Sequence, residues 1–461
     1  MLSQLTIERI LCAALLYAGD FAEIYIESTR SNSLSAINRR IENVSSGIDF
    51  GVGIRVMDGV RSVYVYANST DENVLIKMAK DASASLHSNK CSVAVPLSAI
   101  RQYSTSAPVF LPDSRPDALK ADLLRQACDI ASQYDARITQ TGAGYSDLSR
   151  DIIIANSEGL YVSDHRVRTR FSVEAVATKG NEKQTGRHSP GAGKGLEFID
   201  EMDLNFLATD AARMAVTMIE AKPCPSGRYP VVIGNAFGGV IFHEACGHAL
   251  EATSVGIDAS VFAGKVGEKI ASDCVTAVDD PTMLYEWGSY SIDDEGVEPI
   301  ANTLIDNGIL KSYMIDRLGS RRMNMASTGS GRRQNYRYCP TSRMSNTFIA
   351  AGKETPEQII SDTEYGIYAS SMGGGSVDPA TGEFNFSVNE AYLIQGGKVT
   401  IPLRGATLIG KGDDVLMTID RVADDLKLAQ GVCGSISGHV PASIGQPTIR
   451  VSQMTVGGVD A

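Results

Sequence analysis

The chain has 461 residues, of which 43% are apolar and 21% charged, a composition typical of a globular protein with a large buried core. Its net charge of −12 argues against nucleic acid as a partner, because nucleic-acid binding requires a basic face. No run approaches the roughly 20 apolar residues needed to cross a bilayer, so we also expect no membrane partner.

The amino terminus, MLSQLTIERILCAALLYAG, has the spacing of an amphipathic helix. Its apolar stretch is short and has no basic leader, so it does not fit a signal peptide. The eight cysteines are scattered and form no C-x-x-C pair, which indicates reduced thiols rather than a disulfide framework. We therefore expect a cytoplasmic protein.

Beyond this helix, alternating β-branched and aromatic residues predict a strand over AEIYIES and a hairpin around Asp58-Gly59. Helical spacing returns at residues 71–86 and 117–134, and the proline- and serine-rich segment from Cys91 to Pro116 between them predicts a loop or linker. Further predicted elements are strands near 137–146, 150–156 and 159–178, a polar loop tip at KQTGRHSPGAGKG and a helix over about 201–221.

Prolines and a glycine in KPCPSGRYP, residues 222–230, interrupt both periodicities and mark the best domain boundary. We expect an α+β fold with an N-terminal mixed α/β domain over residues 1–222, which a split near 91–116 would divide into two subdomains. The second domain, residues 228–461, contains many short alternating runs that predict a β-rich sandwich or barrel.

The segment IFHEACGHALEA, residues 241–252, carries the main chemical motif. His243 and Glu244 begin like the zinc-protease motif H-E-x-x-H, but His248 comes one residue later than that motif allows. On a regular α-helix, positions five apart point roughly 140° away from one another, so the two imidazoles could not share an ion. The spacing predicts a π-type turn or a helix end near Gly247, a residue that tolerates unusual backbone. The plainer alternative is a helix with two structural histidines.

A catalytic zinc site usually has three protein ligands and one open position, so a third ligand must lie elsewhere. The residues leave four candidates open: Glu251, Cys246, and Cys433 and His439 of the glycine-rich GVCGSISGHVPASIGQP. An isolated cysteine is more often a small buried hydrophobe, and spacing cannot choose among the four.

The ordered set of segments resembles the TldD/PmbA family, specifically its TldD-type, metal-binding members. HEACGH matches the family's H-E-x-x-x-H, and GSYSIDDEG, TGSGRRQNY, RMSNTFIAAG and GQPTIRVSQMTVGG are also similar to family segments. The resemblance covers most of the chain and is densest after residue 228. It implies peptide-bond hydrolysis, with one Zn²⁺ per chain (another divalent ion being the alternative) held by His243, His248 and Cys433. It also implies that Glu244 is the general base.

The same resemblance implies that the substrate is an unfolded or extended peptide. It implies a dimer, formed with a second copy or with a PmbA/TldE-like subunit. Two other functions stay open: a non-catalytic scaffold in a TldD/TldE-like complex, and a metal-dependent hydrolase of small amides. The intact His243, Glu244, His248 and Cys433 argue against the scaffold.

Three other polar runs can each be explained without a catalytic role. The acidic runs VDDP and IDDEG fit solvated turns better than a second cation site. The segment GRRQNYRY offers Arg332, Arg333, Tyr336 and Tyr338 as oxyanion donors, but it fits a solvated loop equally well, so we assign it no catalytic role.

Overall fold

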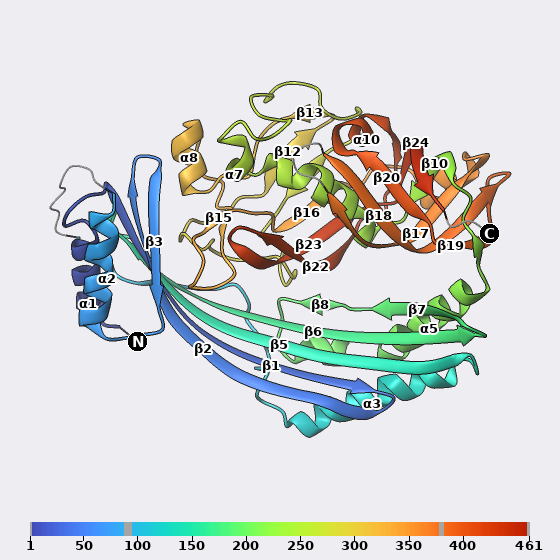
Figure 1. Cartoon of the computed structure of the whole chain (residues 1–461), viewed down its shortest axis with the longest axis horizontal. Helices are drawn as coiled ribbons and strands as arrows, with labels where there is room; N and C mark the ends of the chain where they lie inside the picture. The colour runs from blue at the N-terminus through green and yellow to red at the C-terminus, as the bar shows by residue number, and fades with distance from the viewer. Residues whose placement is uncertain (1, 87–94, 378–381, 459–461) are drawn as a thin grey trace.

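The computed structural model describes residues 2–86, 95–377 and 382–458 (Figure 1). The first half of the chain forms one curved sheet of eight strands with helices packed on it (Figure 1). The strands follow the spatial order β3-β2-β1-β5-β6-β4, and β7 and β8 also pair with β6. The elements of this half are α1 (Gln4–Ala14), β1 (Phe21–Ile37), β2 (Arg40–Asp58), β3 (Arg61–Ala67), α2 (Glu72–Ala84), β4 (Arg101–Ser104), α3 (Asp117–Gln133), β5 (Ile138–Asn156), β6 (Tyr161–Lys179), β7 (Glu182–His188), β8 (Gly191–Ala192), α4 (Glu197–Glu201) and α5 (Leu204–Glu220).

Four strands of this sheet are unusually long and serve two separate cores. β1, β2, β5 and β6 have 17 to 19 residues each, so they extend for about 60 Å, roughly three times an ordinary strand. At one end α1 and α2 pack on the sheet and bury side chains such as Ile54 and Leu75. At the other end α3 and α5 cover it and bury Leu124 and Phe171 (Figure 1).

The expected amino-terminal helix, the strand at AEIYIES and the hairpin after Asp58 are all confirmed. The predicted loop tip KQTGRHSPGAGKG is wrong in part, because residues 182–188 form β7 and residues 191–192 form β8. β7 has solvent along most of its length, so its pairing with β6 needs no apolar run that sequence patterning could detect. The predicted loop from Cys91 to Pro116 contains strand β4, which pairs in parallel with β6, while residues 91–94 lie outside the described residues.

The second half contains a closed barrel and a separate six-stranded sheet. β10, β24, β20, β18 and β17 pair around a complete ring, and the six-stranded sheet has the order β13-β12-β11-β16-β23-β22. The predicted α+β fold, with a barrel in its β-rich part, is therefore confirmed. The domain boundary near 222–228 and the alternative split near 91–116 stay predictions.

The strands of the second half are β9 (Lys222–Pro223), β10 (Gly227–Ile233), β11 (Ala277–Asp279), β12 (Asn302–Asp306), β13 (Ile309–Leu310), β14 (Gly331–Arg332), β15 (Thr341–Ser342), β16 (Asn346–Ile349), β17 (Tyr365–Val377), β18 (Glu383–Gln395), β19 (Lys398–Arg404), β20 (Thr407–Lys411), β21 (Ile419–Val422), β22 (Lys427–Ser435), β23 (Gly438–Gln446) and β24 (Ile449–Gly457). Its helices are η1 (Ala236–Gly239), α6 (Val240–Phe242), η2 (His243–Gly247), η3 (His248–Leu250), α7 (Ala252–Val255), α8 (Arg317–Met323), α9 (Pro356–Ser361) and α10 (Gly412–Thr418). No helix of the described chain is both long enough and apolar enough to span a bilayer.

The helical segment 236–250 lies between the barrel and the six-stranded sheet. Ile241 and Phe242 are buried in one core with residues of both, including Ile233 of β10 and Ile349 of β16. Gly239 meets the backbone of β23 so closely that a Cβ there would lie 2.5 Å from the carbonyl oxygen of Gly445. This packing fixes the segment's position against β23, the partner strand of β22.

Buried ion pairs join the first sheet to residues 287–343. Arg166 of β6 donates from Nη1 to Asp294 (2.7 Å), and Arg333 donates from Nη2 to Glu23 of β1 (2.6 Å). Arg55 of β2 pairs with Glu295, and both side chains are fully buried. The expectation of solvated turns is therefore wrong for Asp294 and Glu295 of IDDEG, because partners distant in sequence neutralise them in the interior. In GRRQNYRY, Arg333 is buried in the same way, whereas Arg337 is exposed.

The acidic run VDDP is also partly buried. Asp279 is 1% exposed, and it accepts hydrogen bonds from the backbone N–H of Ser345 (2.7 Å) and the hydroxyl of Thr347 (2.6 Å). These neutral donors hold the carboxylate inside the six-stranded sheet, so the expected solvated turn is wrong at this residue.

Candidate metal centre

The motif HEACGH forms a wide helical turn. Residues His243–Gly247 have π-helical geometry, in which the backbone N–H of His248 donates to the carbonyl of His243, five residues earlier. The predicted π-type turn is therefore confirmed. The reason expected for Gly247 is wrong, since its backbone is ordinary right-handed helix (φ −56°, ψ −50°). Its missing side chain instead leaves room for Met344, whose sulfur a Cβ would strike.

The wide turn brings both imidazoles to one sulfur. Cys433 Sγ lies 3.2 Å from Nε2 of His243 and 3.3 Å from Nε2 of His248. These three atoms all lie within 4.8 Å of one another, and His243 and Cys433 are buried. No other group of three such side chains could hold a metal within residues 2–86, 95–377 and 382–458.

The electrostatics of the cluster favour a thiolate. Burial raises the pKa of Cys433, but His243 and His248 outweigh this effect through charge and hydrogen bonding and hold the pKa well below its ordinary value. Because the thiolate is the form of cysteine that binds metals, the sulfur is prepared as a ligand. Imidazole and thiolate are ligands that Zn²⁺ takes in proteins, and three protein ligands is the number found in catalytic zinc sites.

Glu251 and Arg343 support the cluster from behind. Glu251 Oε2 lies 3.2 Å from Nδ1 of His248, which directs Nε2 toward the sulfur. Arg343 is fully buried and donates from Nη2 to the carbonyl of Cys433 (2.6 Å) and from Nη1 to that of Gly438 (2.8 Å). A carboxylate behind a ligating histidine fixes the ring and strengthens the imidazole as a ligand.

Three buried atoms around the cluster lack a hydrogen-bond partner in the described chain: Nδ1 of His243, Oε1 of Glu251 and Nε of Arg343. The last two lie 3.8 Å apart and carry opposite charges. Sequence analysis missed Arg343, and the one signal that could have found it is an arginine next to the buried strand at residues 346–349.

Glu244 borders the cluster without belonging to it. Its Oε2 lies 3.8 Å from Nε2 of His248, and its side chain is 31% exposed, so solvent reaches it. A carboxylate beside three convergent ligands and open to solvent is placed where a general base would meet water.

The other three candidates for a third ligand point elsewhere. Glu251 contacts the outer nitrogen of His248 rather than the cluster. Cys246 is buried and directs its thiol to the carbonyl of Gly412 (3.6 Å). His439 is exposed on β23, where its backbone N–H donates to Gln334. Of the four, the structure brings only Cys433 to the two histidines.

Three family models match successive parts of the chain: the PmbA/TldA metallopeptidase domain 1 at residues 22–86, the central domain at 110–219 and the C-terminal domain at 226–458. The chain belongs to the PmbA/TldD family. The resemblance found in the sequence is thus confirmed, and the family is one of metallopeptidases.

Individual relatives agree with this assignment. The chain is 36% identical to a metalloprotease TldD homolog of Buchnera aphidicola, with 95% of this chain and 93% of the relative covered. It is 35% identical to a TldD homolog of Haemophilus influenzae, covering 96% and 93%, and to a metalloprotease of Methanocaldococcus jannaschii, covering 95% and 97%.

Two solved structures share the fold. One is TldE from Thermococcus kodakarensis, with a TM-score of 0.75, 21% identity and coverage of 98% of this chain and 100% of the other. The second, a protein from Thermotoga maritima, has a TM-score of 0.78, 22% identity and coverage of 95% and 96%.

Proposed function

We propose that this protein is a zinc-dependent peptidase that hydrolyses unstructured peptides. The observation that carries the proposal is the convergence of His243, His248 and Cys433 on one point, with Glu244 at its solvent-exposed border. Membership of a metallopeptidase family supports it. A His₂Cys set with a soft thiolate favours Zn²⁺ over the hard cations Mg²⁺ and Ca²⁺.

The side chains divide the work of hydrolysis. His243, His248 and Cys433 would hold the ion, which supplies a Lewis acid that lowers the pKa of water and polarises the scissile carbonyl. Glu244 accepts the proton of the attacking water and passes it to the leaving amine. Glu251 keeps Nδ1 of His248 protonated by accepting its hydrogen bond, so that Nε2 retains a lone pair for the ion.

Peptide hydrolysis measured with and without metal tests the proposal. The purified protein should contain one zinc per chain and cleave a casein-like unfolded chain but not small amides. A chelator should abolish the cleavage, and added zinc should restore it. Cys433→Ser should retain less zinc, since a hydroxyl replaces a soft thiolate. Zinc-free protein of full activity would overturn the proposal, and zinc-loaded protein that cleaves no peptide would favour a scaffold.

We further propose that the chain works in the cytoplasm as a dimer, with a second copy or with a TldE-like subunit. The free state of all seven described cysteines supports a reducing compartment. Light scattering on the purified chain, alone and mixed with a TldE-like protein from the same source, separates the two kinds of dimer.

A further inference from the structure

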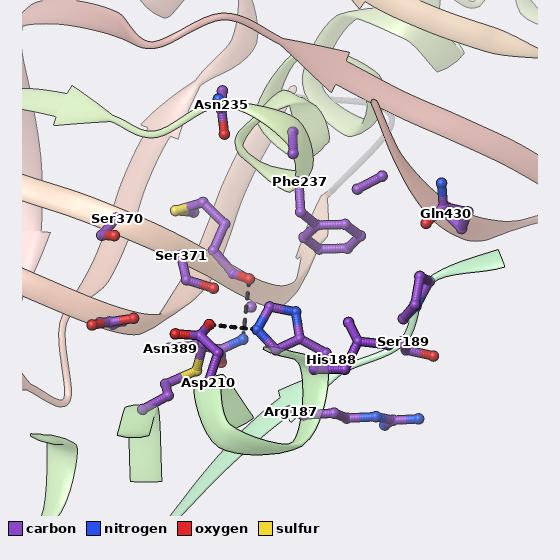
Figure 2. A pocket seen from close by; sticks show the side chains of 18 of the residues that line it. Arg187, His188, Ser189, Asp210, Asn235, Phe237, Ser370, Ser371, Asn389 and Gln430 are labelled. Carbon is purple, nitrogen blue, oxygen red and sulfur yellow. Dashed lines mark hydrogen bonds and ion pairs between the residues drawn. The ribbon is translucent and has the colours of Figure 1, made fainter. Parts of the chain in front are cut away.

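A cavity of about 580 Å³ lies between the first sheet and the barrel (Figure 2). Figure 2 shows Arg187, His188 and Ser189 along one side of it and Asn235 and Phe237 across from them. The first group comes from β7 and the loop after it, and the second lies at the start of the helical segment that carries the metal cluster. The two halves of the chain thus enclose the cavity together.

Two chain segments lead from this cavity to the metal cluster. Strand β22 lines the cavity at Gln430 and reaches Cys433 three residues later, which is about 10 Å along a strand. The helical segment lines it at Phe237 and reaches His243 six residues later, about 9 Å along a helix. Both routes place this wall of the cavity about 10 Å from the cluster.

The carboxylates that line the cavity already have cationic or hydrogen-bonding partners. Asp210 lies 2.6 Å from Nε2 of His188 and accepts from Nε of Arg213 at 2.6 Å. Glu390 accepts two bonds from the same guanidinium, at 2.7 and 3.0 Å. Both oxygens of each carboxylate are thus engaged within this group, and no ion pair joins either carboxylate to the other arginines of the cavity in the described chain.

Two of those arginines, Arg170 and Arg187, have no carboxylate partner among the described residues. Arg170 donates only to neutral oxygens, the hydroxyl of Ser189 (2.8 Å) and the carbonyl of Gln430 (3.3 Å). Burial, and after it the positive charge of Arg187, lowers the pKa of Arg170, so the two guanidinium groups repel each other. Glu174 lies opposite Arg187 in the β6–β7 ladder, but no ion pair joins them in the part of the chain that the structure describes, so both guanidinium groups stay able to bind a carboxylate.

The opposite wall offers backbone to a peptide. Residues 370–374 of β17 line the cavity, and the pairing of β17 with β18 is shifted at three places between Ala369 and Gly375. Such bulges leave backbone groups outside the ladder, and here the carbonyls of Met372 and Gly374 accept from the side chains of Asn389 and Ser387. Gly374 has open space where a side chain would stand, so another main chain can approach it closely. These features favour an extended peptide over a small free anion.

We propose that Arg170 and Arg187 form a subsite for a carboxylate of the peptide, either an acidic side chain or the C-terminus, about three residues from the bond that is cleaved. This inference rests on the proposed peptidase function. The spacing follows from the separation of about 10 Å and the rise of about 3.3 Å per residue of an extended chain.

Fluorescence anisotropy with three labelled peptides tests the subsite in zinc-loaded Glu244→Ala protein, which would bind without cleaving. One peptide has an internal glutamate and an amidated end, the second has glutamine there and a free C-terminal carboxylate, and the third has glutamine and an amidated end. At least one carboxylate peptide should bind about 10-fold more tightly than the neutral peptide, and the tighter one identifies the source of the carboxylate. Equal binding of all three, or binding of none, would overturn the subsite.

Substitutions of single arginines test whether the preference for carboxylate peptides comes from the cavity. Arg187→Gln should abolish the preference, because this exposed side chain makes no ion pair that the substitution could break within the described chain. Arg187→Lys should keep part of it, since the charge remains. Arg125→Gln removes the same charge from α3 on the far side of the first sheet and should leave the preference intact (Figure 1). A preference that survives Arg187→Gln would overturn the assignment.

The outcomes also separate the subsite from the proposed function. Chelator-sensitive cleavage that ignores peptide charge would leave the peptidase standing and remove the subsite. If the protein prefers carboxylate peptides in binding but never cleaves them, the subsite stands and the peptidase function is excluded.

Discussion

The metal cluster and the joint between the first sheet and residues 287–343 both bury charged groups, but they satisfy them in different ways. In the joint, Arg166 and Arg333 meet Asp294 and Glu23 directly at 2.6–2.7 Å. In the cluster, the sulfur of Cys433 lies 3.2 Å from Nε2 of His243 and 3.3 Å from Nε2 of His248. The joint therefore pairs opposite charges with each other, whereas the cluster gathers electron-pair donors that a divalent cation would complete.

This difference predicts that substitutions in the cluster change chemistry and substitutions in the joint change stability. The largest effect is expected for Glu244→Ala. Loss of the general base should lower kcat by about 10² to 10⁴. Because Glu244 is not among the three ligands, the zinc content should stay at one per chain, as measured by elemental analysis beside the peptide assay. Cleavage at the parental rate would show that another group moves the proton.

Arg333→Met tests the joint. It leaves Glu23 buried without its cationic partner, and breaking a buried pair in this way costs about 3–5 kcal/mol of unfolding free energy. Urea unfolding measures the loss. Arg337→Met is the matched control, because its pair with Asp49 is more than one-third exposed and should contribute under about 1 kcal/mol. If both variants lose the same unfolding free energy, burial of the ion pair does not explain its contribution to stability.

Glu251→Gln tests whether the carboxylate behind His248 strengthens metal binding. Glutamine can still accept the hydrogen bond from His248 but lacks the charge, so zinc affinity should fall by about 10- to 100-fold with little change in folding. Competition with a zinc-binding dye measures the affinity. The exposed Glu268→Gln should have no effect, and an unchanged affinity in Glu251→Gln would remove the supporting role.

A dependence on pH is expected at the edge of the joint. Burial, with the nearby charge of Glu295 as a second cause, raises the pKa of Asp316 to about 6. The folded state then holds this proton more tightly than the unfolded state, whose pKa is about 4, so stability falls as the pH rises from about 4 to about 6.

Asp316→Asn removes that titration and can still accept the bond from the backbone N–H of Gly319 that caps α8. The variant should be more stable than the parent at pH 7 by about 3 kcal/mol, and the difference should vanish near pH 4. Parallel stability curves over this range, from urea unfolding at each pH, would exclude the effect.

The sequence predicted what depends on local geometry. The spacing of His243 and His248 is incompatible with a regular helix that binds one ion, so the motif alone indicated the π-type turn that the structure contains. The alternation of β-branched residues likewise located the first part of β1 and both ends of β5, but it predicted neither the full length of β1 nor that β5 is one strand.

Local sequence patterns could not predict contacts between residues that lie far apart in the chain. Cys433 lies 185 residues after His248 and meets it only because β22 pairs with β23, which packs on the helical segment. The acids of IDDEG were expected in solvent because their partners, such as Arg55 and Arg166, lie 240 and 128 residues away. A charged run does not reveal whether a distant partner neutralises it.

X-ray absorption spectroscopy at the zinc edge tests the central claim most directly, because it measures the atoms bound to the ion. The account predicts one sulfur at about 2.3 Å and nitrogen or oxygen neighbours at about 2.0–2.1 Å, with the sulfur absent in Cys433→Ser. If the spectrum of the parent protein shows no sulfur bound to zinc, or if Cys433→Ser leaves the spectrum unchanged, the ion binds elsewhere and the proposed metal centre is contradicted.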